Sequence, residues 1–245
     1  MNEKIRLDLA LEQRGLLPSR ARARDAILRG TVTVNGQVAG KPHQMVAHQD
    51  KIALSDPAAN YVSRAALKLI AGLDAGEIDV TGKTCIDVGA STGGFTQVLI
   101  ERGAAKVYAV DVGHEQLHER LLGSNRVISL EGTNARDLTV EMIPDPLDIL
   151  VCDVSFVSVT KVLAAPLSLC KSGAEAVILY KPQFEVGREN VGKGGIVVDT
   201  SSIETALADM IAFITGEGWI YLQSLPSPLS GGDGNTETVT VFRKV

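Results

Sequence analysis

A glycine-bearing loop at residues 87–95 constrains the fold of this chain more than any other feature. The apolar run Thr84-Cys-Ile86 leads into the loop Asp87-Val-Gly-Ala-Ser-Thr-Gly-Gly-Phe95, and a second apolar segment follows at 96–100. This order predicts a strand, a tight turn and a helix whose free N–H groups face a ligand. Because glycine lets the backbone approach a ligand closely, the pattern predicts a nucleotide-type pocket at the carboxyl end of this strand.

The spacing of the loop glycines separates two kinds of nucleotide pocket. A dinucleotide-binding loop reads G-x-G-x-x-G, whereas here Ser91 replaces the second glycine and Gly93 and Gly94 form a pair. This spacing is more similar to the S-adenosylmethionine (SAM) loop of methyltransferases than to a pyrophosphate loop. A tight turn without a ligand is the alternative. The predicted cofactor-binding residues of the loop are Asp87, Gly89, Ser91, Thr92, Gly93, Gly94 and Phe95.

Strand and helix patterns alternate after residue 61, which predicts a mostly parallel sheet with helices on both faces; the expected helices include 63–73 with Ser63 as its cap, 115–122 and 159–169. The last two strands, 219–225 and 237–242, have no helix between them and are expected to be antiparallel neighbours. Asp111 and Val112 end the next strand about twenty residues past the loop, where an acid can accept from ribose hydroxyls. Asn134 follows a further strand, at the place of an adenine edge. An NAD site would share Asp111, so Ser91 is the feature that disfavours it.

Positive charge is concentrated in the first 60 residues, although the whole chain of 245 residues has a net charge of −5. Residues 1–60 carry nine Lys and Arg against six Asp and Glu, and the remainder carries 15 against 23. We therefore expect a small α+β domain at 1–55, a linker at 56–60 and a larger α/β domain at 61–245. Five arginines of the first domain are predicted to bind RNA: Arg6, Arg20, Arg22, Arg24 and Arg29.

The first domain resembles the S-four RNA-binding module. The residues that carry the resemblance are Arg6-Leu-Asp-x-x-Leu, Ser19-Arg-x-x-Ala23 and Gly30-x-Val-x-Val-Asn-Gly36. Two short helices at 7–14 and 20–29 and an Asn35-Gly36 hairpin are expected. An arginine-lined helix beside a hairpin suits phosphate binding, and a solvated polar helix face is the alternative.

Four charged residues lie at places where a substrate would need them: Lys68, Asp153, Lys181 and Glu237. Three of them end or begin strands, so the topology is expected to bring them to one edge of the sheet. Burying charge is costly without partners, so such residues mark a site. A lysine held near carboxylates and a second cation suits methylation of a weakly acidic ribose hydroxyl. A structural ion pair between Lys181 and Asp153 is the alternative.

The larger domain resembles the FtsJ-type ribose methyltransferases and, more narrowly, the TlyA or haemolysin A family. The resemblance lies in Ser63-Arg-Ala-Ala-Leu-Lys-Leu69, the 87–95 loop, Asp111-Val-Gly113, Cys152-Asp-Val-Ser-Phe156, Lys181-Pro-Gln-Phe-Glu185 and Gly192-Lys-Gly-Gly195. It implies a Rossmann-like SAM-dependent domain, 2′-O-methylation of a cytidine in ribosomal RNA, and catalytic roles for Lys68, Asp153, Lys181 and Glu237. Ribosomal RNA or ribosomal subunits are the implied partners, with no membrane and no obligate protein partner.

Three other classes of function were weighed against this interpretation. His114-Glu-Gln-Leu-His118 fits a zinc-protease motif, but the other histidines lie in the first domain, so we expect a helix surface and no metal. A pore-forming haemolysin would need a signal peptide or an amphipathic membrane segment. A non-catalytic RNA-binding or assembly factor stays an alternative. Three dispersed cysteines and the lack of a long apolar run predict a cytoplasmic protein.

Overall fold

The computed structural model describes residues 4–229, 231 and 234–245. Part of the loop before Glu237, at residues 230 and 232–233, therefore lies outside the described residues. The chain divides into two compact units, Met1–Asn60 and Tyr61–Val245, each of which is described by itself.

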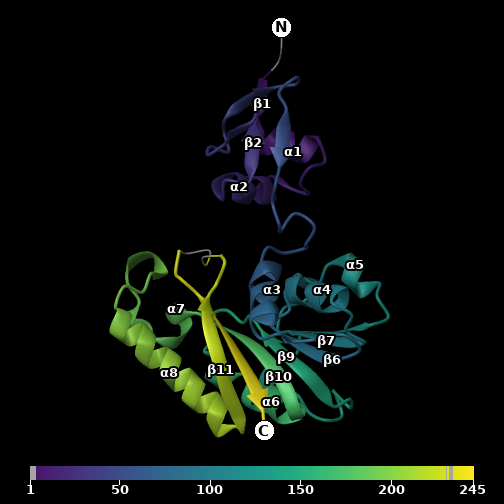
Figure 1. Cartoon of the computed structure of the whole chain (residues 1–245), viewed down its shortest axis with the longest axis vertical. Helices are drawn as coiled ribbons and strands as arrows, with labels where there is room; N and C mark the ends of the chain where they lie inside the picture. The colour runs from purple at the N-terminus through teal and green to yellow at the C-terminus, as the bar shows by residue number, and fades with distance from the viewer. Residues whose placement is uncertain (1–3, 230, 232–233) are drawn as a thin grey trace. The chain divides into compact units, whose positions relative to one another are not determined.

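The described residues of the N-terminal unit form two helices and two small sheets (Figure 1). Helix α2 begins after Ser19, whose side chain accepts a hydrogen bond from the Arg22 N–H. Asn35 and Gly36 both have positive φ angles, as a two-residue hairpin between β2 and β3 requires. The strand pair β1–β4 was not predicted from the sequence. The elements are β1 (Lys4–Arg6), α1 (Leu7–Gln13), α2 (Arg20–Leu28), β2 (Val32–Val34), β3 (Gln37–Val38), β4 (Met45–Ala47) and β5 (Ile52–Leu54).

Seven strands form one sheet in the described part of the second unit, in the order β11-β12-β10-β9-β6-β7-β8. The five strands from β10 to β8 are parallel, and β12 runs antiparallel between β10 and β11. The predicted Rossmann-like sheet and its antiparallel C-terminal pair are thus confirmed. The strands are β6 (Thr84–Val88), β7 (Lys106–Asp111), β8 (Val127–Glu131), β9 (Leu147–Cys152), β10 (Cys170–Tyr180), β11 (Trp219–Pro226) and β12 (Thr238–Lys244).

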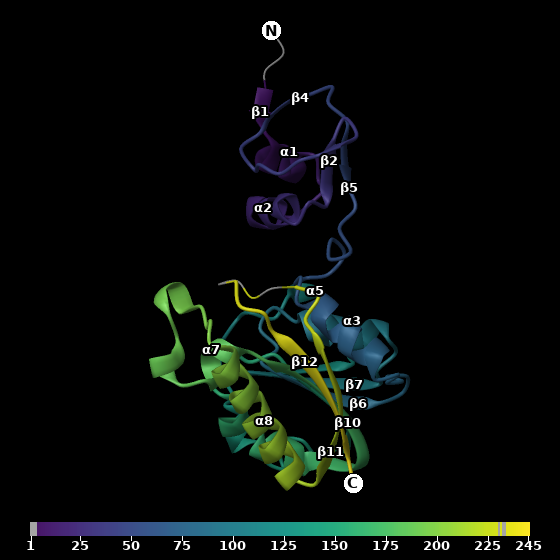
Figure 2. The same cartoon turned by 60° about the vertical axis from the view of Figure 1, so that its left-hand side comes forward.

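Helices cover both faces of this sheet, as Figures 1 and 2 show. On one face, α3 and α4 pack their apolar side chains on the sheet, and on the other α6 and α8 do so. The helices are α3 (Ala66–Ala75), α4 (Gly94–Glu101), α5 (Glu119–Leu122), α6 (Ala164–Leu169), α7 (Pro182–Glu185) and α8 (Thr200–Gly216), with short 3-10 turns η1 (Ala135–Asp137), η2 (Val159–Lys161), η3 (Arg188–Asn190) and η4 (Lys193–Gly195). None of the helices in the described residues is both long and apolar enough to cross a membrane.

Three local predictions differ from the structure. The helix expected from 115 begins only at Glu119, because Glu115 takes a positive φ of 55°. His114 and His118 therefore do not share a helix face, and His118 instead caps α5 by accepting from the Arg120 N–H. The helix expected at 159–169 is divided into η2 and α6. Helix α3 begins at Ala66, and Ser63 accepts from the Ala65 N–H in the turn before it.

Candidate active site

The loop between β6 and α4 turns sharply above the sheet. Gly89 and Gly93 have φ angles of 84° and 93°, and Ser91 has a positive φ of 47°. A Cβ atom at Gly89 would lie 3.1 Å from the Asp153 carbonyl oxygen, so this position needs a glycine for the loop to approach the end of β9. A Cβ atom at Gly93 would lie 2.2 Å from a Leu121 methyl carbon. The glycines thus serve the packing of the loop as well as its turn.

Asp111, at the end of β7, holds this loop through its side chain. One carboxylate oxygen accepts from the Ser91 N–H at 2.8 Å and the other accepts from the Gly113 N–H at 2.8 Å. Each carboxylate oxygen has a second lone pair, so Asp111 keeps capacity for ligand hydroxyls. The Ser91 hydroxyl donates to the Gln116 side chain at 3.1 Å, which ties the loop to the segment before α5.

A pocket of about 430 Å³ opens at the carboxyl ends of β6, β7 and β9. Its volume lies in the range of ligand sites, and apolar side chains form much of its wall with a few polar groups among them. Five predicted cofactor residues line it: Gly89, Ser91, Asp111, Val112 and Asn134. An apolar wall beside a carboxylate fits the adenine and ribose of SAM, so the residues present suit this cofactor.

Asp87 is placed differently from the other predicted cofactor residues. Its side chain is fully buried beneath the loop, where one oxygen accepts from the Thr96 hydroxyl at 2.6 Å. The other oxygen has no hydrogen-bond partner among the described residues. Burial raises the pKa of Asp87 to about 7, and the Thr96 hydrogen bond opposes this shift. Asp87 and Gly93 line neither this pocket nor its neighbour, so the structure shows them as supports of the loop.

The four charged residues predicted from the sequence meet at one edge of the sheet. Lys181 Nζ lies 2.7 Å from Asp153 Oδ1, and Lys68 Nζ lies 2.5 Å from Glu237 Oε2 and 3.7 Å from Asp153 Oδ2. The side chains are 4–13% exposed, so solvent screens these pairs weakly. We call Lys68, Asp153, Lys181 and Glu237 the charged quartet. The alternative of an isolated ion pair between Lys181 and Asp153 is therefore wrong, because Lys68 lies near the same carboxylate.

Sheet topology explains why the charged quartet converges. Tyr180 pairs with Thr238 across β10 and β12, so the residues just beyond the pair, Lys181 and Glu237, lie at the same end of the sheet. Lys68 comes from α3, which packs on these strands. Gly72 of this helix faces the strands and has no side chain. A Cβ atom at Gly72 would lie 2.4 Å from a Val177 methyl carbon. This glycine, one helical turn after Lys68, therefore sets how closely α3 approaches the sheet.

A second pocket of about 260 Å³ contains the charged quartet. Three predicted cofactor residues, Thr92, Gly94 and Phe95, line this pocket. Its wall also includes Gly89, Ser91, Asp153 and Ser155, which the larger pocket shares. The two pockets are therefore neighbours, and a reactive group at their boundary would face the lysines.

Several lining residues were not predicted from the sequence. Ser155 accepts a hydrogen bond from Lys181 Nζ at 2.8 Å and lines both pockets. Phe156 has a positive φ of 68° and is 91% exposed, and its ring lies 5.3 Å from that of Phe184. The sequence signal for both Ser155 and Phe156 was the segment Asp153-Val-Ser-Phe156, which follows the end of a strand.

Glu185 was also not predicted. It accepts from the Ser158 hydroxyl and from the Val159 N–H, and its burial raises its pKa.

In the N-terminal unit, Asp8 organises two of the predicted RNA-binding arginines. Its fully buried side chain accepts from Arg6 at 2.8 Å and from Arg20 at 3.3 Å. Hydrogen bonds from Arg6 and Arg20 lower the pKa of Asp8 to about 2, against the effect of burial. Arg6 and Arg20 remain 44% and 50% exposed, and Arg24 is exposed on α2. These three arginines have surface available for a phosphate.

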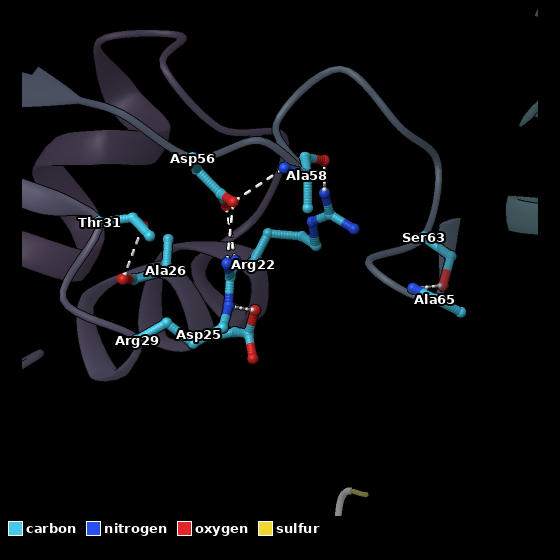
Figure 3. A network of polar contacts seen from close by, with 9 residues as sticks. All are labelled: Arg22, Asp25, Ala26, Arg29, Thr31, Asp56, Ala58, Ser63 and Ala65. Carbon is cyan, nitrogen blue, oxygen red and sulfur yellow. Dashed lines mark hydrogen bonds and ion pairs between the residues drawn. The ribbon is translucent and has the colours of Figure 1, made fainter. Parts of the chain in front are cut away.

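Arg22 and Arg29 have a structural task within the same unit (Figure 3). Arg29 donates to both carboxylate oxygens of Asp56, at 2.9 and 2.6 Å, and to Asp25 at 2.9 Å. Asp56 also accepts from the Ala58 N–H, and Arg22 donates to the Ala58 carbonyl oxygen at 2.6 Å. The segment predicted as a linker is thereby fixed to α2 at 56–58. RNA binding by these two arginines stays a prediction.

Comparisons with known protein families match both parts of the chain. Residues 61–244 match the FtsJ-like methyltransferase family and residues 5–52 match the S4 domain. The 16S/23S rRNA (cytidine-2′-O)-methyltransferase TlyA of Mycobacterium tuberculosis is 42% identical over 97% of this chain and 89% of that protein. Hemolysin A of Brachyspira hyodysenteriae is 41% identical over 97% of this chain and 99% of that protein.

A solved structure supports the same assignment. A protein from Streptococcus thermophilus described as a hemolysin superposes with a TM-score of 0.77 at 36% identity, covering 100% of this chain and 90% of that one. An S-adenosylmethionine-dependent methyltransferase from Listeria monocytogenes, at 15% identity and a TM-score of 0.54, shows the shared fold. SAM is the methyl donor of this class of enzyme, and the larger pocket fits it. The chain therefore belongs to the FtsJ-like methyltransferase family, in the TlyA group that carries an S4 domain before the methyltransferase domain.

Proposed function

We propose that this protein transfers the methyl group of SAM to the 2′-hydroxyl of a cytidine in ribosomal RNA. The observation that carries the proposal is the charged quartet, buried in a pocket that adjoins the candidate cofactor pocket. The named activity of the Mycobacterium tuberculosis relative supports the choice of a cytidine ribose and of ribosomal RNA.

The residues of the larger pocket would hold the cofactor. Asp111 would accept from the ribose hydroxyls, Asn134 would face the adenine edge, and the Gly89–Ser91 segment would leave room for the ligand. When bound, SAM supplies an electrophilic methyl group on a positively charged sulfur. The loss of that charge in the reaction removes the need for an oxyanion hole, so the protein has to orient the hydroxyl and accept its proton.

The two lysines of the charged quartet have different surroundings, which suggests different roles. Lys68 Nζ faces two carboxylates, at 2.5 Å from Glu237 Oε2 and 3.7 Å from Asp153 Oδ2. Lys181 faces one carboxylate and the neutral hydroxyl of Ser155. We therefore assign Lys181 as the group that accepts the proton of the 2′-hydroxyl. Asp153 holds Lys181, and Lys68 with Glu237 holds Asp153 in place.

The S4 domain would bring the RNA to this site. Arg6, Arg20 and Arg24 offer exposed guanidinium groups that suit phosphate contacts. Ribosomal RNA, free or within a subunit, is the proposed partner, and a bacterial cytoplasm is the compartment in which it is met.

A transfer assay with isolated ribosomal RNA tests the proposal. The protein is incubated with ribosomal subunits and SAM labelled in its methyl group, and the RNA is digested to nucleosides for mass spectrometry. The label is expected in 2′-O-methylcytidine. Label on a cytosine or other base would refute the ribose chemistry, and absence of transfer to every RNA offered would favour the non-catalytic alternative.

A further inference from the structure

Ser155 occupies a position in the candidate active site, and no role was predicted for its side chain from the sequence. It follows the end of β9 by three residues and lines both pockets. Its hydroxyl oxygen accepts a hydrogen bond from Lys181 Nζ at 2.8 Å. It is thus an uncharged group in contact with a lysine that otherwise faces a carboxylate.

Lys181 Nζ contacts the carboxylate of Asp153 and the hydroxyl of Ser155. The two contacts differ in the charge of the partner and in hydrogen-bond geometry. Asp153 Oδ1 lies 2.7 Å from Nζ, but no hydrogen-bond partner of this oxygen has acceptable geometry among the described residues. The contact is an ion pair, whose energy depends on distance far more than on angle. The contact with Ser155 meets hydrogen-bond geometry, and hydrogen bonds weaken steeply when they are misaligned. Ser155 therefore fixes the rotation of the Lys181 amino group.

We propose that Ser155 is a positioning residue that aims the lone pair of the Lys181 amine at the substrate hydroxyl. A neutral amine has two N–H bonds and one lone pair. With one N–H donated to Ser155 and Asp153 beside the amino group at 2.7 Å, the amine can turn its lone pair to the pocket that both lysines line. The proton of the 2′-hydroxyl then passes to Lys181 Nζ as the oxygen forms its bond to the methyl carbon and the carbon–sulfur bond breaks with its electron pair on sulfur. This role rests on the proposed function.

The chemistry predicts an unusual pair of effects when the hydroxyl is removed. A hydrogen bond accepted from an ammonium group stabilises the charged form more than the neutral form. Without it, the amine forms at lower pH but is no longer aimed. The rate at high pH should therefore fall, while the midpoint of the acidic limb of the pH–rate profile moves to lower pH. A general disturbance of the loop would lower the rate without moving this midpoint.

The experiment compares three variants of the full-length protein under single-turnover conditions with saturating SAM and ribosomal subunits. Ser155→Ala is expected to lower the plateau rate by about tenfold, the effect of one hydrogen bond to a charged group. Because Ser155 is exposed, this truncation leaves no buried cavity. Ser155→Thr keeps the hydroxyl and should restore most of the rate and the original midpoint.

Ser158→Ala is the matched control. Ser158 lies in the same loop, but its hydroxyl donates to Glu185 at 2.6 Å and contacts neither lysine. This variant should keep the midpoint of the wild-type profile. Four results would overturn the proposal: an unchanged plateau in Ser155→Ala, a lower plateau in that variant with an unmoved midpoint, an equal loss in Ser155→Thr, or a tenfold weaker SAM affinity that accounts for the loss. If the unchanged protein forms no 2′-O-methyl nucleoside, the proposed function itself fails, and the two failures are thereby distinguished.

Discussion

Lys68 Nζ lies 2.5 Å from Glu237 Oε2, although 169 positions of the chain separate the two residues. Lys68 is 9% exposed and Glu237 is 4% exposed, so the pair lies largely out of water. Desolvating two charges is costly and is repaid only in part by their attraction. Such a pair is weak evidence of stabilisation. Its place in the pocket with Asp153 and Lys181 fits the catalytic role that we propose for the charged quartet.

A double-variant cycle on this pair separates stability from activity. Lys68→Met leaves Glu237 buried without its cation, and Glu237→Leu leaves Lys68 with the more distant Asp153. Each single variant is expected to lose roughly 3–5 kcal/mol in the free energy of unfolding. The double variant should regain most of this loss in denaturant unfolding and remain inactive in methyl transfer. Recovery of activity in the double variant would contradict a catalytic role for the pair.

Lys181→Ala should reduce methyl transfer by about 10²–10⁴-fold, the usual effect of losing a general base. SAM affinity, measured by calorimetry, should change little, since Lys181 does not line the larger pocket. Lys171→Ala is the control, because Lys171 lies near the other end of the same strand, paired with Asp148 at 2.6 Å. Joint loss of SAM binding and transfer in Lys181→Ala would show a structural role instead.

Gly72→Ala tests whether the close approach of α3 positions Lys68. The added Cβ would overlap Val177 at 2.4 Å and Val239 at 2.8 Å, so the helix must move away from the sheet. Overpacking of this kind costs about 1–3 kcal/mol, and we expect a lower melting temperature and slower transfer together. Gly216→Ala in α8 has open space and should be neutral. A second substitution, Val177→Ala, should restore the rate of Gly72→Ala by making room.

The pH dependence of stability should carry a contribution from Asp87. Burial raises the pKa of Asp87 from 3.8 to about 7 in the folded protein. Between these two pH values the folded state binds more protons than the unfolded state, so stability falls as pH rises from about 4 to about 7. Asp87→Asn cannot ionise, and its amide oxygen can still accept from Thr96. The variant should melt at a higher temperature than the unchanged protein at pH 8 and at the same temperature near pH 4.

Arg24→Ala should weaken the binding of ribosomal RNA and leave SAM affinity unchanged. Loss of one phosphate contact lowers the salt dependence, so the slope of log K against log salt concentration should become shallower by about one. Arg243→Ala is the control, since Arg243 lies on β12 of the second unit and pairs with Glu175 at 2.9 Å. Binding measured across a salt series would contradict the assignment if both variants had the slope of the unchanged protein.

The order of strands and helices could be predicted because apolar runs and glycines mark most of them. The convergence of Asp153 and Lys181 also followed, since residues at the carboxyl ends of parallel strands share one edge, and Glu237 joins them because β12 is antiparallel to β10. The sequence did not predict the local structure at positions where an unusual backbone angle determines it. The positive φ of Glu115 delays α5, and that of Phe156 exposes its ring, and neither residue type favours such an angle.

The sequence also did not predict which groups individual residues contact in the folded protein. Arg22 on α2 and Arg29 at the C-cap of this helix lie near Arg20 and Arg24 in the sequence, and spacing alone gives all four the same role. Only the folded unit shows that Arg22 donates to the Ala58 carbonyl oxygen and that Arg29 donates to Asp56. Likewise, Gly72 reads as an ordinary helix glycine until its approach to Val177 is known.

If this protein methylates a cytidine ribose in ribosomal RNA, cells that lack it should lose that methyl group. The most direct test is a map of 2′-O-methylated nucleotides in ribosomal RNA from cells with the gene intact, with the gene deleted, and with Lys181→Ala in its place. At least one 2′-O-methylcytidine is expected to be present only in the first cells. Identical maps from all three, or loss of a base methylation instead, would contradict it.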